Sequence, residues 1–443
     1  MNASQVLNDK KTINAWAFFD WANSSYALVI TVAIFPAYFV SVTDDMLQIG
    51  RMHLSNSSLY AYAISAAYLI IAIFSPWLSG IADYGGKKKF FMKFFTVLGS
   101  LACMSLFFFK GMSDANTVGQ NTAQLLVGTA SFILATIGFA GGLVFYNAYL
   151  PEIVTEDRYD RVSARGYAYG YIGSVILLLI NLTVIMNPGW FGIAQDSFAV
   201  RLAFIMVGLW WLGFALIPFR ILPPDPRNKP KENLMSKGFE ELLKVWRAVR
   251  QEANIKSFLL SFFCYSAGVQ TVLFLASTFA EKELAFGTAE LISIILLLQI
   301  VAIGGAYLFA TVSGRKGNKF SLATMLIIWM AICLLAFFVE EKWQFYVVAA
   351  LVGLVMGGIQ SLSRSTYSKL IPEKTTDTTS YFSFYDILEK TAVVLGTFSF
   401  GLVEQLTGGM RNSILALAAF FLISLLVLTR VKISHSRVRP GTV

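Results

Sequence analysis

Residues 291–338 read LISIILLLQIVAIGGAYLFATVSGRKGNKFSLATMLIIWMAICLLAFF. Two long apolar runs flank one short turn, residues 314–319 (GRKGNK). Each run is long enough for an α-helix to cross the hydrocarbon core of a bilayer, which takes about 20 residues. The cations gather in the turn between the runs, as they do in cytoplasmic loops of membrane proteins. This stretch therefore predicts two antiparallel membrane helices joined by a basic turn.

The composition of the whole chain agrees with this pair of helices. Of 443 residues, 56% are hydrophobic and 14% are charged, and the mean hydropathy is +0.64. Ordinary soluble domains carry about 25% charged residues, so a soluble fold would leave too much apolar surface in water. The apolar runs are continuous and do not alternate with a period of two, which excludes a β-barrel. We therefore expect an all-α membrane protein.

Twelve apolar segments are long enough to cross the bilayer. They are residues 13–42, 57–82, 90–110, 123–150, 166–186, 199–221, 257–280, 288–313, 320–339, 343–371, 381–404 and 411–431. Because the number is even, both ends of the chain are expected on the same side of the membrane.

The loops on the two sides of the membrane differ in charge. Those on one side hold most of the cations, from Lys10 and Lys11 to Lys432, Arg437 and Arg439. Those on the other side are acidic and contain Asp44, Asp45, Asp114, Asp196, Glu281, Glu283, Glu340 and Glu341. Basic loops stay in the cytoplasm, so we expect cytoplasmic termini in an integral protein of the cell (inner) membrane.

The net charge of +9 does not indicate nucleic-acid binding, because the cations lie in short loops and form no continuous face. The three cysteines, Cys103, Cys264 and Cys333, each lie within an apolar stretch, which is typical of small packing residues. We therefore expect no metal, no cofactor and no nucleic-acid partner. The lipid bilayer is the expected environment of the surface.

A polar linker divides the chain into two sets of six segments. Residues 1–221 form the first set, residues 222–256 the linker, and residues 257–443 the second set with its basic tail. The part from Phe239 to Arg250 is amphipathic and basic. It fits a helix on the anionic inner leaflet and equally a solvated connector.

The two sets repeat each other. Residues 83–88 (DYGGKK) follow the second segment, and residues 314–319 (GRKGNK) follow the eighth. The fourth segment ends in residues 146–152 (YNAYLPE), and the tenth ends in residues 367–373 (YSKLIPE). Matched landmarks in the same order predict a parallel duplication about an axis along the membrane normal.

Twelve segments in two halves with these turns resemble the major facilitator superfamily. Residues 19–24 (FDWANS), 146–152, 163–173 (SARGYAYGYIG) and 360–365 (QSLSRS) resemble its vacuole-effluxer (autophagy-related) branch. The resemblance covers essentially the whole chain. It implies two pseudo-symmetric six-helix bundles around a cavity that opens alternately to each side. It also implies amino-acid export, with which the fungal relatives are associated.

Several positions depart from the pattern of these relatives. Ser79 stands where the superfamily turn usually has Gly, and Tyr84 where it usually has Arg. The second turn has Gly314 where the first has Asp83. Relatives often carry an acid before the glycine of the seventh segment, where this chain has Ala267. If that acid carries coupling protons in relatives, coupling here needs another group.

The first segment contains a carboxylate at a depth where charge is costly, by roughly 2.5–3.5 kcal/mol on insertion scales. Asp20, Asn23 and Ser24 follow at i, i+3 and i+4, so they share one helix face. We expect Asp20 to line a cavity and to bind a substrate amine or a proton. The alternative is an acid near the cytoplasmic mouth that pairs with a basic loop.

The tenth segment carries one polar stripe of Gln360, Ser363, Arg364 and Tyr367. The Arg364 guanidinium would bind a substrate carboxylate through two hydrogen bonds. The alternative is an ion pair that locks the cytoplasmic side.

The eleventh segment contains Tyr385, Asp386, Glu389 and Lys390. Asp386 and Lys390 are spaced i, i+4, which suits an ion pair and leaves Glu389 without an obvious local partner. Glu389 would then shuttle protons or pair with Arg364 across the cavity.

Other candidates complete the pathway and a gate. Tyr146, Asn147 and Gln270 are polar groups within membrane segments, although single amides more often join helices than bind ligands. In the superfamily the acid that matches Asp83 helps to hold the halves together on the cytoplasmic side. The residues expected to form this cytoplasmic gate are Asp83, Gly86, Lys87, Lys88, Glu152, Arg315 and Gly317.

Together these features predict a secondary-active transporter of a small solute that works by alternating access as a monomer. Asp20 and Arg364 would together suit a zwitterion, so an amino acid is the favoured substrate, and protons are a candidate coupling ion. An enzyme is not expected, because the two histidines, His53 and His435, lie outside the apolar segments. The alternative is a non-transporting membrane sensor or scaffold that keeps the transporter fold.

Overall fold

The computed structural model describes residues 7–49, 52–113, 115–193, 196–226, 233–372, 375–407 and 410–433. Asp114, Glu373, Arg437, Arg439 and His435, which entered the expectations above, lie outside these residues.

The first half of the chain contains these helices: α1 (Lys10–Ser25), the π-helix η1 (Tyr26–Ile34), α2 (Phe35–Ser41), α3 (Asn56–Gly85), α4 (Lys88–Ser105), η2 (Leu106–Phe108), α5 (Val118–Asn147), α6 (Leu150–Ile153), η3 (Glu156–Arg158), α7 (Tyr159–Met186), η4 (Pro188–Phe191) and α8 (Asp196–Ile221). The linker and the second half contain α9 (Leu234–Gln251), α10 (Ala253–Leu284), α11 (Thr288–Lys316), α12 (Asn318–Phe337), α13 (Lys342–Leu370), α14 (Thr378–Thr407) and α15 (Met410–Leu428). Strands β1 (Met46–Ile49) and β2 (Met52–Ser55) form an antiparallel hairpin.

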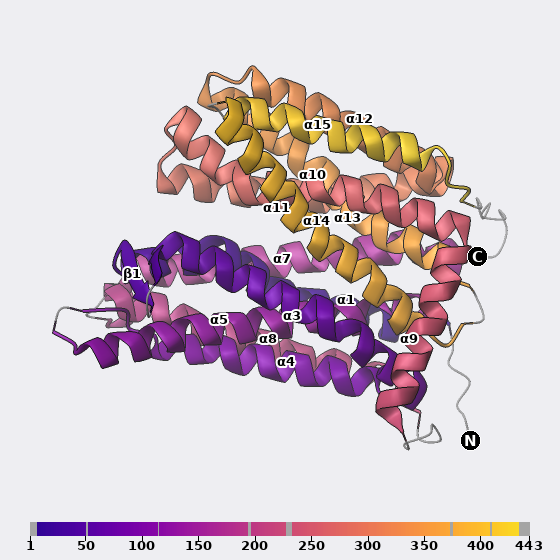
Figure 1. Cartoon of the computed structure of the whole chain (residues 1–443), viewed down its shortest axis with the longest axis horizontal. Coiled ribbons are helices and arrows are strands. Elements are labelled where there is room, and N and C mark those ends of the chain that lie inside the picture. Colours follow the sequence, from indigo (N-terminus) through magenta and orange to yellow (C-terminus); the bar gives the residue numbers. More distant parts are fainter. Residues whose placement is uncertain are drawn as a thin grey trace.

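The membrane helices form two bundles with separate hydrophobic cores (Figure 1). The first bundle holds α1 to α8 and the second holds α10 to α15. The bundles touch where α3 packs against α14 and where α7 packs against α11 and α13. In the α3–α14 pair, the second membrane helix of the first half meets the fifth of the second half. In the α7–α11 pair, the fifth of the first half meets the second of the second half, so the two contacts are related as a parallel duplication requires. The fold is therefore the expected all-α one, with twelve membrane helices in two pseudo-symmetric bundles.

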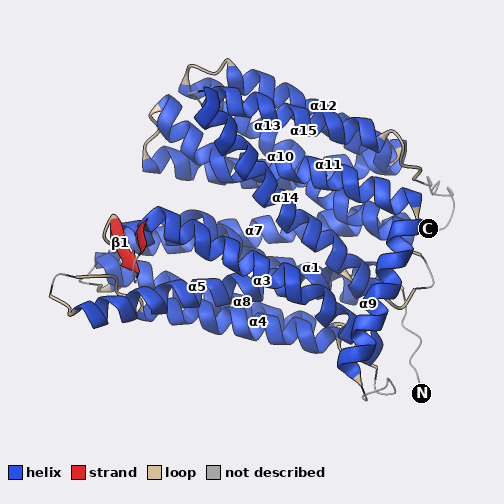
Figure 2. Ribbon diagram, viewed as in Figure 1, coloured by secondary structure: helices blue, strands red, loops and turns tan. Residues whose placement is uncertain are grey.

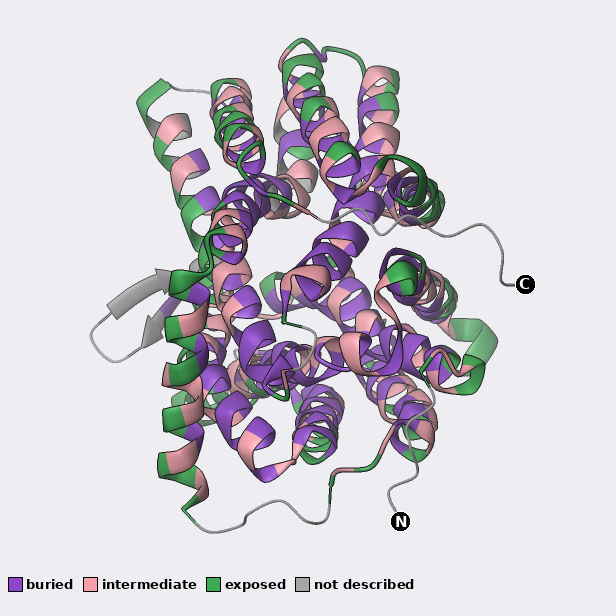
Figure 3. Cartoon of the chain, turned by 90° about the vertical axis from the view of Figure 1, so that its right-hand side faces the viewer, coloured by how far each residue is buried: buried purple, intermediate pink, exposed green. Residues whose placement is uncertain are grey.

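The surface of both bundles is apolar where lipid would lie. Among the described residues, ten helical segments are long and apolar enough to cross a membrane. The other two predicted membrane helices are α10 and α14, and α14 carries three charged side chains within two turns. Figure 3, seen from the end that bears α9, shows buried residues turned inward and exposed residues on the rim. Large apolar side chains such as Leu69, Phe398 and Leu426 are more than half exposed, and the transfer of such apolar surface from water to hydrocarbon is favourable.

Two local features differ from the expected continuous first helix and open loop. The first membrane segment changes from α-helix to π-helix at Tyr26 and returns to α-helix at Phe35. The loop after it folds into the β1–β2 hairpin, visible at the far end from α9 (Figure 2). A run such as residues 26–34 (YALVITVAI) has the composition of an ordinary membrane helix, so its sequence does not distinguish the two helix types.

Helix α9 lies across the end of both bundles (Figure 1). Against the first bundle, the backbone of Gly238 meets Gly80 of α3 so closely that a Cβ at Gly80 would lie 2.0 Å from the Gly238 oxygen. Against the second, Lys244 pairs with Asp377 at 2.9 Å just before α14. Hydrogen bonds to Glu241 and Asp377 raise the pKa of Lys244 above its ordinary value. The linker thus folds into a helix that contacts both halves.

Candidate functional site

The end of the molecule that carries α9, called the α9 end, holds two polar clusters that join the bundles. The first, the Asp83 clasp, lies where α3 ends and α14 begins. The Asp83 carboxylate accepts hydrogen bonds from the backbone N–H groups of Thr379 (3.2 Å) and Ser380 (2.7 Å). These groups belong to the first turn of α14, where helix N–H groups have no partner in the helix and the dipole favours an anion.

The same clasp contains an ion pair from the first bundle. Lys88 at the start of α4 pairs with Glu152 of α6, and both contact the Thr378 hydroxyl, at 2.9 and 2.7 Å. Asp83, Lys88 and Glu152 therefore lie together at the bundle interface, where the expected gate places them.

The second cluster, the Asp160 clasp, occupies the equivalent position in the other half. Asp160, at the start of α7, accepts hydrogen bonds from Ser313 and Asn318 at the α11–α12 turn, each at 2.8 Å. Lys369 near the end of α13 lies 2.8 Å from the same carboxylate. The acid thus comes from the helix start and the donors from the turn, whereas in the Asp83 clasp the acid comes from the turn.

This reversal explains why the second turn has Gly314 where the first has Asp83: the carboxylate is supplied by α7. It also changes part of the expected gate. Arg315 is exposed, and Gly317 forms the turn with a φ of +87°. Gly86 likewise turns the backbone, with a φ of +61°, and Lys87, just before α4, lies over the Phe90 ring of that helix.

Arg364 lies farther from the α9 end than the clasps, toward the middle of the molecule. Polar and aromatic residues of the other bundle enclose its side chain, and we call this enclosure the box around Arg364. Its guanidinium donates to the Ser163 side chain and carbonyl (both 2.9 Å), to Asn147 (3.2 Å) and to Asp20 (3.3 Å). Asp20 also accepts a hydrogen bond from Tyr146 at 2.7 Å.

Three aromatic rings complete the box around this cation. Its carbon Cζ lies 4.3 to 5.5 Å from the ring centres of Tyr167, Trp16 and Tyr146. The Arg364 side chain is 2% exposed. Of the two expected roles of Arg364, this conformation has the ion pair, with its donors directed to α1, α5 and α7 of the other bundle.

A small pocket of about 10 Å³, enough for about one water molecule in this conformation, lies beside this box and is lined by α7, α10, α13 and α14. Its aromatic lining residues are Tyr167, Phe262, Tyr265 and Tyr385, and its polar ones include Gln270, Gln360, Ser363 and Glu389. Gln360 accepts a hydrogen bond from Tyr171 of α7 at 2.6 Å, and Ser363 is bonded to Tyr265 at 2.6 Å. The polar stripe of α13 therefore faces both the pocket and the other bundle.

Glu389 does not pair with Arg364, and its local partners differ from the sequence expectation. It has local partners, because Lys390 lies 3.3 Å from one carboxylate oxygen and Gln270 donates to the other at 3.3 Å. Lys390 also pairs with Asp386 at 3.3 Å and lies over the Tyr68 ring of α3. Arg364 of α13 pairs with Asp20 and not with Glu389. Glu389 lies on α14, where Lys390 is its cationic partner.

The three candidate residues of α1, Asp20, Asn23 and Ser24, contact different neighbours. Asp20 faces Arg364, and Ser24 packs against α7, where a Cβ at Gly170 would lie 2.6 Å from its hydroxyl. Asn23 is fully buried, and neither polar atom of its amide has a hydrogen-bond partner. Helical spacing predicted the shared face but not that neighbouring helices would divide it.

Sequence reasoning missed Asp160, Asn318, Lys369 and the first turn of α14. These groups lie at helix ends, where charged and polar side chains are ordinary and give no signal of burial. A signal did exist for Lys369, which belongs to the repeated landmark at residues 367–373.

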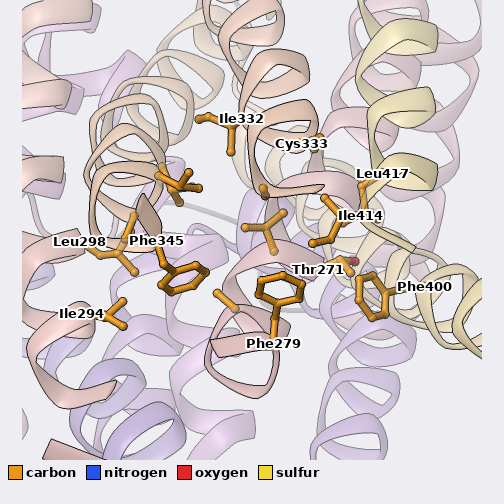
Figure 4. Close-up of a pocket in the computed structure, with 16 residues that line it drawn as sticks. Thr271, Phe279, Ile294, Leu298, Ile332, Cys333, Phe345, Phe400, Ile414 and Leu417 are labelled. Carbon is orange, nitrogen blue, oxygen red and sulfur yellow. The ribbon is translucent and has the colours of Figure 1, made fainter. Parts of the chain in front are cut away.

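A second pocket lies inside the second bundle (Figure 4). Among the described residues its lining is apolar apart from Thr271 and Cys333, with the rings of Phe279 and Phe345 side by side. It offers no charged group to a polar solute.

A third and larger pocket lies at the α9 end and is lined by the clasp residues Asp83, Lys88 and Glu152. The polar pocket at the bundle interface, called the central pocket, is our candidate solute site, because residues of both bundles line it.

Comparison with known proteins agrees with this architecture. The family model described as "Vacuole effluxer Atg22 like" matches residues 8–440. The uncharacterized MFS-type transporter YxiO of Bacillus subtilis is 31% identical over 94% of this chain and 94% of its own length. Autophagy-related protein 22 of Yarrowia lipolytica is 25% identical over 84% of this chain and 73% of its own.

Among solved structures, FucP, a major facilitator superfamily transporter in the outward conformation, superimposes with a TM-score of 0.70 at 13% identity. The superposition covers 96% of this chain and 99% of that one. The chain therefore belongs to the Atg22-like vacuole effluxer family and is an integral membrane transporter of the major facilitator superfamily.

Proposed function

We propose that this protein carries a small solute by alternating access, with residues 1–221 and 257–443 rocking about the central pocket as two units. One observation carries the proposal: two clasps in pseudo-equivalent positions join the bundles at the α9 end, and the ribbons of the two bundles diverge toward the hairpin end (Figure 1). Because the clasps are made of side chains at helix ends, they can open without unfolding a helix. A single chain contains both halves of the pathway, so a monomer suffices.

We assign the α9 end to the cytoplasmic side of a cell membrane. The basic turns lie at this end, and loops rich in Lys and Arg lie on the cytoplasmic side of membrane proteins. The described ends of the chain lie there too, since Asn8 contacts Thr155 and Lys432 contacts Asn254. The conformation described here is then closed toward the cytoplasm.

The proposed solute is of the amino-acid class and the proposed direction is efflux. The name of the family supports the direction. Glu389, with its side chain 26% exposed, is the candidate carrier of coupling protons, because it is the carboxylate among the described residues that line the pocket.

Uptake by proteoliposomes tests the proposal. Purified protein should accumulate labelled leucine, faster with an imposed pH gradient than without one. Arg364→Ala should abolish uptake, because it removes the cation that links α13 to α1, α5 and α7. Arg315→Ala, at an exposed position of the α11–α12 turn, is the matched control and should transport normally.

Different results lead to different conclusions. Suppose that, for every amino acid, peptide and sugar tested, liposomes with protein take up no more solute than liposomes without it. The proposed transport function is then wrong, and the sensor or scaffold is favoured. If uptake occurs but ignores the pH gradient, proton coupling alone is wrong.

A further inference from the structure

The charges around the central pocket are not balanced. Asp20 and Arg364 form a one-to-one pair. On α14, however, two carboxylates, Asp386 and Glu389, share the single ammonium group of Lys390. One oxygen of Asp386 is buried without a hydrogen-bond partner. An excess negative charge at membrane depth needs a matching cation.

The pocket presents that negative charge to a solute. Glu389 is the one charged residue among the described residues that line it. Each carboxylate oxygen can accept two hydrogen bonds, and the known partners of Glu389 are Gln270 and Lys390. Its carboxylate therefore keeps acceptor sites for a further donor.

The walls of the pocket also suit a cation. Four aromatic residues line it: Tyr167, Phe262, Tyr265 and Tyr385. The faces of such rings carry partial negative charge and attract an ammonium group, by about 0.5–1 kcal/mol at exposed sites and about 2 kcal/mol when desolvated.

A solute carboxylate, by contrast, finds both nearby cations occupied. The guanidinium of Arg364 is enclosed by Asp20, Asn147 and Ser163. Lys390 is 9% exposed and lies between Asp386 and Glu389. Binding an anion would require breaking one of these buried pairs, which is unfavourable.

We propose that the central pocket selects its solute by a single protonated amine, bound by Glu389 against the aromatic wall, and does not recognise a carboxylate. This rests on the proposed transport function and narrows its substrate class. An amino acid enters because it carries an ammonium group, and its decarboxylated amine should bind at least as well.

Three small molecules that share the isobutyl side chain of leucine separate the charges. Leucine carries both groups, 3-methylbutylamine only the amine, and 4-methylpentanoate only the carboxylate. Thermal stability of the purified full-length protein in detergent at pH 7 reports binding, which is needed because the amine crosses lipid unaided. Leucine and 3-methylbutylamine should raise the melting temperature, and 4-methylpentanoate should not.

A charge-removing variant tests the assigned residue. Glu389→Gln keeps the shape of the side chain and should weaken binding of 3-methylbutylamine by about 30-fold or more. Glu290→Gln, which removes a carboxylate paired with Lys342 at the start of α11, is the control and should bind as the wild type does. The wild-type comparison of the three molecules stands even if Glu389→Gln proves unstable.

The inference is overturned if 4-methylpentanoate stabilises the protein, if 3-methylbutylamine does not, or if Glu389→Gln binds the amine unchanged. Leucine uptake judges the transport function separately. Uptake of leucine without amine binding would remove the inference and leave transport. Amine binding without any uptake would leave the site and remove transport.

Discussion

At the scale of single residues, Arg364 shows most clearly what sequence can and cannot reveal. A guanidinium inside an apolar helix stands out in any sequence, because its burial is costly without partners. The choice between Asp20 and Glu389 as its partner depends on how three helices pack, which no spacing rule contains. Asp160 gave no signal, because an acid beside Arg158 and Arg161 at a helix start is ordinary.

The box around Arg364 leaves no room for a side chain at Gly166. A Cβ there would lie 2.6 Å from Oδ2 of Asp20 and 2.8 Å from a guanidinium nitrogen of Arg364. We expect Gly166→Ala to push this pair apart and to lower the free energy of unfolding by about 1–3 kcal/mol. Thermal unfolding in detergent measures the effect.

Gly213→Ala is the control for that substitution, since a Cβ at Gly213 meets no atom within 4 Å. Both positions lie inside long helices, so the gain in helix propensity is the same. Equal stability of the two variants would contradict the close packing described around Arg364.

At the scale of elements, most ends of the membrane helices were predicted within about four residues, because length and apolarity define them. The exceptions are α5 and α7, which begin at Val118 and Tyr159, five and seven residues before the predicted starts at 123 and 166. The π-helix and the β hairpin were not predicted, since a local change of hydrogen-bond pattern leaves no trace in composition. Helix α9 was half predicted: the amphipathic pattern indicated a helix, but lipid contact and solvent were both open. The structure places part of it against protein through Gly80 and Gly238.

We expect the contact between α9 and α3 to fail if Gly238 gains a side chain. A Cβ there would lie 2.6 Å from Cγ1 and 2.8 Å from the backbone nitrogen of Ile81. Gly238→Ala should therefore release α9, so that limited trypsin digestion cuts the linker several-fold faster. Ser236→Ala, on the exposed side of the same helix, should be cut at the wild-type rate, and faster cutting of both would point to helix unfolding instead.

At the scale of the whole molecule, the two clasps together hold the α9 end shut. Each uses a charged group in several hydrogen bonds, and such bonds contribute about 1.5–3 kcal/mol apiece. We expect Asp83→Asn and Asp160→Asn each to shift the population toward a state open at the α9 end by about tenfold or more. Because the clasps share no residue, their effects should add in the double variant.

A cysteine thiol placed at the buried interface between the bundles would report this opening. Ser361→Cys puts a cysteine at a fully buried position of α13, whose carbonyl accepts a hydrogen bond from Ser163. Its labelling by a water-soluble maleimide should rise in both clasp variants, whereas exposed Ser236→Cys should label equally in all. Unchanged labelling of Ser361→Cys would show that the clasps do not control access.

The opposite polarity of the two clasps makes the halves non-interchangeable. A tandem of two N-terminal halves would set Asp83 of one copy against Asp160 of the other, so that like charges repel. A tandem of two C-terminal halves would set the hydroxyl and amide donors of its turn against the N–H groups of α14, with no carboxylate to receive them. Only the pairing of two unlike halves found here places a carboxylate opposite its donors on both flanks.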